Sequence, residues 1–151
     1  MTMRAAAIWM GVAMWAGPVY AAKPPASLDE ARAEANPEKR SVLALDFARA
    51  AVGRVVSAFE REEDDEAREL LESIVEAAAL AESSLDETGK HARAKPKYFK
   101  NAEIETRKLA RDLENSKRKL TYEERDALDP AIARIEEINR RLLLAIMESR
   151  K

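Results

Sequence analysis

Residues 38–59 carry the widest apolar surface in the sequence and constrain the fold more than any other stretch. Apolar side chains recur there at alternating steps of three and four residues, which places them on one face of an α-helix. The central stripe consists of Leu45, Ala48, Val52, Val55 and Phe59, and the positions that widen it to roughly half the circumference are Phe47, Ala51, Val56 and Ala58. A helix this apolar has to contact more than one neighbour, so we expect it at the centre of a helical bundle.

Residues 1–21 have the layout of a secretory signal peptide. Arg4 gives a short basic start, an unbroken run of apolar residues and glycine follows over 5–16, and a Gly-Pro pair ends that run. Val19 and Ala21 supply the small residues that a signal peptidase reads. The alternative is an uncleaved membrane anchor, but the run is shorter than the ~20 apolar residues that span a bilayer. We expect cleavage near Ala21, a periplasmic or secreted protein, and no membrane span after cleavage.

Two features of the composition have consequences for the mature protein. Both tryptophans, Trp9 and Trp15, lie in the expected signal, so the mature chain should contain none. The sequence also has no cysteine, so no disulfide can form and no lipid can be attached at a cysteine. The remaining chain of about 130 residues is long enough for one modest core, which has to form by burial alone.

Helix start and stop signals divide the rest of the chain. Asn36 and Pro37 have the residue types of an N-cap and a first helical residue. Gly89 can adopt the left-handed conformation that ends a helix. These signals and the apolar spacing place helices over 37–61, 66–85, 98–120 and 121–148. Because the first connection is short, its two helices should pack antiparallel. The expected fold is all-α, an antiparallel bundle of about four long helices over residues 37–151.

The segment before the bundle, residues 22–36, reads as a flexible lead-in. Its Pro-Pro pair favours extended backbone. Ser27 and Glu30 match a capping box and favour a short helix over 28–35.

The last two expected helices carry further local signals. The apolar seam of the helix over 98–120 is narrow, as in a coiled-coil strand, and leaves room for a homodimer without requiring one. Thr121 and Glu124 match a capping box that begins the final helix. Asp129 and Pro130 should then interrupt this helix, either as a new N-cap or as a kink.

Charge is distributed unevenly along the chain. Residues 22–86 carry 8 basic and 16 acidic side chains, and residues 87–120 carry 11 basic and 5 acidic ones. Residues 121–151 are nearly neutral, with 6 basic and 7 acidic side chains. An acidic first half followed by a basic middle indicates either an internal pairing of charge or a surface for an anionic partner.

A short basic segment with two aromatic residues is the candidate binding site. Cations beside aromatic rings can hold phosphates or anionic membrane surfaces. The alternative is that Phe99 begins the core seam and the cations pair with the acidic helices of the same molecule. An exported protein meets lipid headgroups, cell-wall polymers or acidic proteins rather than nucleic acid. The candidate residues for an anionic partner are Lys90, Arg93, Lys95, Lys97, Tyr98 and Lys100.

Motifs for catalysis, metals and cofactors are not recognisable in the sequence. His91 is the only histidine, which is too few for a zinc or di-iron cluster. A haem would need Cys-x-x-Cys-His, which is absent, or a pairing of Met147 with His91 across the bundle. The acidic run over 60–66 lacks the alternating spacing and glycine of a calcium loop. Ser116 and Lys119 match Ser-x-x-Lys in letters, without its companion motifs. We expect no catalytic, metal or cofactor-binding residues.

These observations lead to an expectation of function at the level of class. The first hypothesis is an exported, non-catalytic binding or scaffold protein whose partner is an unidentified protein or an anionic envelope component. The alternative is a periplasmic chaperone or stress sensor that holds clients on an apolar face larger than the few hundred Å² usual for monomers. A third hypothesis, an enzyme without a readable motif, requires a pocket lined by converging carboxylates.

Overall fold

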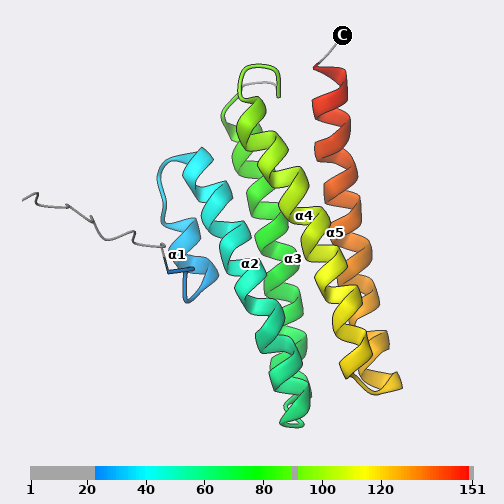
Figure 1. Cartoon of the computed structure of the whole chain (residues 1–151). Helices are drawn as coiled ribbons and strands as arrows, with labels where there is room; N and C mark the ends of the chain where they lie inside the picture. Colours follow the sequence, from blue (N-terminus) through cyan, green and yellow to red (C-terminus); the bar gives the residue numbers. More distant parts are fainter. Residues whose placement is uncertain (1–22, 90–91, 150–151) are drawn as a thin grey trace, which may run out of the picture.

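The computed structural model describes residues 23–89 and 92–149, and the regular secondary structure of this part of the chain is all helical (Figure 1). The segment expected to be a signal peptide lies outside the described residues. The helices are α1 (Leu28–Arg32), α2 (Pro37–Glu60), α3 (Asp64–Glu87), α4 (Pro96–Ser116), the 3₁₀ turn η1 (Lys117–Lys119) and α5 (Tyr122–Glu148). All five α-helices pack against one another, so the expected all-α bundle is confirmed.

α2 begins and packs as its sequence predicts. Asn36 caps it, since Oδ1 accepts hydrogen bonds from the backbone N–H of Glu38 at 2.9 Å and of Lys39 at 3.1 Å, and Pro37 is the first helical residue. Every residue of the expected apolar stripe is buried. α1, α3 and α4 all contact α2, which confirms that this helix has more than one neighbour.

The boundaries of α3 and α4 differ from expectation by a few residues. α3 is a turn longer in total than expected, and Gly89 beyond it has a φ of 62°, the left-handed conformation predicted for a helix stop. α4 begins at Pro96 rather than Tyr98, because proline fits the first helical position, where no N–H donor is needed. α4 ends at Ser116 and passes into η1.

α5 is one continuous helix, so the expected break with a new N-cap at Asp129 is wrong. Pro130 lies inside the helix, and no new N-cap forms at Asp129. Leu128 and Ile132 on either side of the proline are buried in the core, and their packing holds the helix together across the missing hydrogen bond. At the start of α5, Glu124 accepts a hydrogen bond from the backbone N–H of Thr121 at 2.7 Å, as the capping box predicts.

α1 is shorter than predicted and starts differently. It spans five residues, and the Ser27 side chain makes no capping hydrogen bond. Glu30 instead accepts from the backbone N–H of Ala26 at 3.2 Å. α1 is held by burial of Leu28 and Ala31 and by an ion pair between Arg32 and Glu76 of α3 at 2.8 Å.

The bundle consists of two hairpins, α2–α3 and α4–α5, each antiparallel (Figure 1). The hairpins meet through parallel helices: α2 lies beside α4, and α3 lies beside α5. Interhelical ion pairs show that the helices of each parallel pair run in the same direction. At the starts of α2 and α4, the side chains of Glu38 and Lys95 are 2.9 Å apart. Near the ends of α3 and α5, Glu82 and Arg141 are 2.7 Å apart. The bundle is therefore antiparallel within each hairpin and parallel between them.

Candidate functional site

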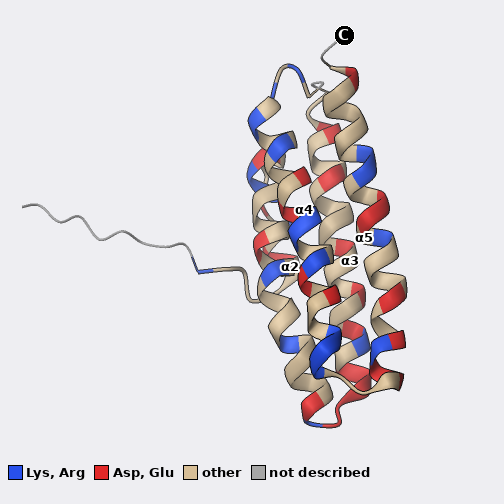
Figure 2. Ribbon diagram, turned by 45° about the vertical axis from the view of Figure 1, so that its right-hand side comes forward, with Lys and Arg blue, Asp and Glu red and all other residues tan. Residues whose placement is uncertain are grey.

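The predicted basic site lies at one end of the bundle, where the connection from α3 enters α4 (Figure 2). Lys90 belongs to the expected set but lies outside the described residues. Phe99 is 3% exposed and belongs to the core, and Tyr98 is half-buried against it. These two rings fix the start of α4 on the bundle, so Lys97 and Lys100 are carried by a packed helix and Arg93 by the turn that leads into it.

Lys95 is neutralised within the molecule. Its Nζ lies 2.9 Å from Oε1 of Glu38, and this hydrogen bond, with the charge of the same carboxylate, raises the pKa of Lys95. Lys95 therefore fits the alternative expectation, in which a cation of the segment pairs with an acidic helix of the same chain. It joins α2 to α4 and is not available to a partner.

Arg93, Lys97 and Lys100 are exposed and form no ion pair among the described residues. We refer to these three side chains as the cationic end. The first turn of α4 contains no acidic residue, and its N-cap, Lys95, makes no side-chain capping hydrogen bond. The positive end of the α4 dipole therefore adds to the charge of the cationic end.

A second surface was missed by sequence reasoning. Among the described residues, five large hydrophobic side chains are exposed, and all except Tyr122 lie on α4 or in the last two turns of α5: Ile104, Leu143, Leu144 and Met147. The sequence signal that could have revealed this surface is the apolar run over 142–147, Leu-Leu-Leu-Ala-Ile-Met. A helix that packs along one stripe cannot bury apolar residues on all sides, so part of this run had to face outward.

The hydrogen bonds of Asn139 set the register between α4 and α5. Its Nδ2 donates to the backbone oxygen of Glu103 at 2.7 Å and to Oγ1 of Thr106 at 2.9 Å. Leu143 lies one helical turn beyond Asn139 on the same side of α5. Because the helices are antiparallel, that turn lies beside the part of α4 that carries Ile104.

A shallow groove of about 290 Å³ continues along this seam. The small side chain of Ala110 leaves room for this groove, and Arg107, Arg111 and Glu136 line the edges of the groove. Arg107 pairs with Glu103 at 3.3 Å, whereas Arg111 forms no ion pair among the described residues. The exposed seam of the α4–α5 hairpin is therefore apolar toward the cationic end, and two arginines and two glutamates line its groove.

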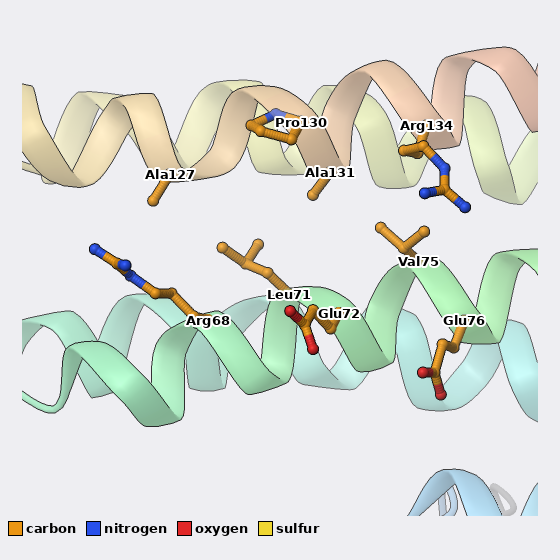
Figure 3. Close-up of a pocket in the computed structure, with 9 residues that line it drawn as sticks. All are labelled: Arg68, Leu71, Glu72, Val75, Glu76, Ala127, Pro130, Ala131 and Arg134. Carbon is orange, nitrogen blue, oxygen red and sulfur yellow. The ribbon is translucent and has the colours of Figure 1, made fainter.

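A larger open groove lies between α3 and α5 and has a volume of about 490 Å³ (Figure 3). Leu71 and Val75 point from α3 toward α5, with Ala127, Pro130 and Ala131 opposite them. Its ionisable side chains are Arg68, Glu72, Glu76 and Arg134. Glu76 is held by Arg32 of α1, so the carboxylates of this groove do not converge on a common point as the enzyme hypothesis requires.

Near the end of α3, burial raises the pKa of Asp86, the charge of Glu82 raises it further, and Arg141 opposes the rise. Arg141 forms two 2.7 Å hydrogen bonds to the carboxylate of Glu82, which raise the pKa of the guanidinium. This cluster joins α3 to α5 and is a structural contact.

Over the described ranges, no group of three or more histidine, cysteine or acidic side chains could hold a metal ion. Among the helices of residues 23–89 and 92–149, none has the length and apolar content needed to cross a membrane. No protein-family model matches the chain, and no curated protein or solved structure is significantly similar to it.

Proposed function

We propose that this chain is an exported, non-catalytic binding or scaffold protein that recognises an anionic partner through the cationic end. The observation that carries the proposal is the contrast within one segment. Lys95 is paired with Glu38, whereas Arg93, Lys97 and Lys100 are exposed and unpaired within the described part of the chain. Exposed cations at the packed start of one helix and in the turn before it raise the local positive potential and attract anionic groups.

The partner class follows from the charge and from the expected export. The candidates are an acidic protein and an anionic component of the cell envelope, since the pattern of residues 1–21 favours secretion and makes nucleic acid an improbable partner. Both present carboxylate or phosphate groups, which lysine and arginine bind by charge-assisted hydrogen bonds. Binding should therefore weaken as salt rises.

The test is retention of partners from an envelope extract by the immobilised protein. The variant Arg93→Glu/Lys97→Glu/Lys100→Glu should lose at least about tenfold in retention, because three attractive contacts become repulsive. A matched control reverses three other exposed, unpaired cations, in Arg54→Glu/Arg68→Glu/Arg134→Glu. The proposal fails if nothing is retained specifically, or if the two triple variants retain the partner equally.

A second candidate, a chaperone-like protein that holds clients, is favoured by the exposed apolar side chains of Ile104, Leu143, Leu144 and Met147. It predicts that the protein suppresses aggregation of a heat-denatured client, and that Leu143→Ser/Met147→Ser removes most of this effect. The control is Tyr122→Ser, which removes the other exposed large hydrophobic side chain. Aggregation that proceeds equally with and without the protein contradicts this candidate.

A further inference from the structure

We infer that the α4–α5 face is the docking site for an acidic amphipathic helix of the partner. We define this face as two exposed strips, one on each helix. The α4 strip is Lys100, Ile104, Arg107 and Arg111, and the α5 strip is Glu136, Arg140, Leu143 and Met147. The inference rests on the proposed binding function and names the structural form of the partner.

The two strips have the same helical spacing. Each contains residues at i, i+4, i+7 and i+11, which lie on one face of an α-helix, and all eight side chains are exposed. The hydrogen bonds from Asn139 to Glu103 and Thr106 bring the strips side by side. The face therefore runs along the seam of one hairpin and shares Lys100 with the cationic end.

The apolar part of the face can bury further surface. Ile104 is 38% exposed, Leu143 is 43% exposed and Met147 is 56% exposed, although the core of the same two helices is closed. Their side chains lie within about two turns of one another, so one partner element can cover them together. Single exposed apolar residues are common on proteins, but a cluster on one helical face indicates a contact surface.

The shape of the seam favours a helix over a flat membrane surface. The groove of about 290 Å³ at Ala110 and Asn139 continues the line of the apolar cluster. A row of side chains from a third helix fits into such a groove, as in other helix-in-groove contacts. A bilayer surface would leave the groove unfilled.

The charges favour an acidic partner. The two strips carry four cations, Lys100, Arg107, Arg111 and Arg140, against one carboxylate, that of Glu136. Lys100, Arg111 and Arg140 form no ion pair among the described residues. A second copy that docks by the same face would bring together two surfaces that each carry four cations and one carboxylate, which repel each other. The acidic corner over 60–66 of a second copy could meet the cations but offers no exposed large apolar side chain to cover Leu143. The occupant is therefore a helix of another protein.

The inference is tested with a fluorescent synthetic peptide that forms an amphipathic helix, with leucine at i, i+3, i+4 and i+7 and glutamate on the flanks. We expect anisotropy titrations to show binding that is at least about tenfold tighter than for a scrambled peptide of the same composition. Ile104→Glu and Leu143→Glu should each weaken it by at least about tenfold. Tyr122→Glu is the control, because Tyr122 is 77% exposed and lies at the opposite end of α5. Circular dichroism establishes that each variant is folded.

Several results would overturn the inference. These are equal binding of the helical and scrambled peptides, unchanged binding by Leu143→Glu, co-sedimentation with vesicles of anionic phospholipid in place of peptide binding, and a dimer that Leu143→Glu dissociates. The proposed function is judged separately, with the partner retained from the envelope extract. If the triple change in the cationic end abolishes retention while Ile104→Glu and Leu143→Glu do not, the function stands and the helical docking site is wrong.

Discussion

Asn139 forms partly buried hydrogen bonds from α5 to Thr106 and to the backbone of Glu103 on α4. Thr106 is fully buried, and its hydroxyl lies 2.8 Å from the backbone oxygen of Ala102. Asn139 donates to this hydroxyl and to Glu103, so one amide satisfies two acceptors. Buried polar groups that are satisfied specify one register, because any slip would leave them unpaired.

We expect Asn139→Ala to lower the free energy of unfolding by about 1–2 kcal/mol, since the amide is lost and two partly buried acceptors remain. Urea denaturation measures this difference. Asn115→Ala is the control; Asn115 is exposed, and its change should stay within about 0.5 kcal/mol. Equal effects of the two changes would contradict the role given to Asn139.

Lys117 ties the α4–α5 turn to the start of α5. Its Nζ lies 2.6 Å from Oδ1 of Asp129 and 2.7 Å from Oε2 of Glu114. These hydrogen bonds, that with Asp129 foremost, raise the pKa of Lys117 above its ordinary value of 10.5. The folded protein therefore holds this proton more tightly than the unfolded chain does.

A pH dependence follows from the direction of that shift. The stabilisation from charged Lys117 is fully present below its ordinary pKa of 10.5 and is lost as the pH rises through the raised pKa of the folded state. We expect wild type to be more stable than Lys117→Met at neutral pH, with a difference that shrinks at alkaline pH. Urea denaturation in a series of alkaline buffers measures the difference. A gap that stays constant or widens contradicts the assignment.

At the scale of the element, α5 shows how packing overrides a local stop signal. Pro130 has no N–H, so the carbonyl of Asp126 has no helical donor. Leu128, Ala131 and Ile132 are nevertheless buried, and the helix continues for eighteen residues beyond the proline, to Glu148. The proline is therefore tolerated because the surrounding face is packed.

Replacing this proline should stabilise the bundle. We expect Pro130→Ala to raise the free energy of unfolding by roughly 1–3 kcal/mol, because a helical hydrogen bond becomes available and a steric conflict is removed. Pro96→Ala is the matched control, since Pro96 is the first residue of α4 and should be neutral or destabilising by up to about 1 kcal/mol. If Pro130→Ala destabilises the protein, the proline has a packing role that outweighs the missing hydrogen bond.

Most of the helices could be predicted because their signals are local. The wide stripe of α2, its Asn36-Pro37 start and the stop at Gly89 all depend on neighbouring residues, and all three are confirmed. The failures at Pro130 and Ser27 occur where a local preference competes with distant packing or with another hydrogen-bond partner. The pairing of α2 with α4 could not be predicted, because it depends on how the side chains of two helices far apart in the sequence pack against each other.

The candidate site, too, could be predicted only in part. The basic segment is visible in the sequence, but the pairing of Lys95 with Glu38 joins residues far apart in the chain, and both interpretations of the segment were open. The α4–α5 face was missed because its residues come from two helices. Leu143 and Met147 become a surface only when Asn139 fixes α5 beside Ile104 of α4.

At the scale of the whole molecule, the two hairpins carry different charge (Figure 2). The α2–α3 hairpin holds the acidic excess, which includes the corner where Arg61 pairs with Glu63 and Glu66. The basic residues of 87–120 lie on α4 and its connections. The cationic end and the α4–α5 face both belong to the second hairpin, so the second hairpin is the proposed binding half and the first its support.

Export can be tested on the whole chain by fluorescence. If the signal is cleaved near Ala21, the protein purified from the exported fraction has lost Trp9 and Trp15 and should show only tyrosine emission, from Tyr98 and Tyr122. The uncleaved protein, produced without export, provides the control and should show tryptophan emission. Tryptophan emission from the exported form contradicts cleavage at this place.

The most direct test of the account is a hydrogen-exchange footprint of the partner retained from the envelope extract. The amide exchange of the free protein is compared with that of the complex, residue by residue. We predict that slowed exchange is concentrated in residues 92–104 and 140–147, the start of α4 with the turn before it and the end of α5, which carry the cationic end and the apolar cluster. Protection confined to the α2–α3 hairpin, or no protection at all, would contradict the assignment of binding to the second hairpin.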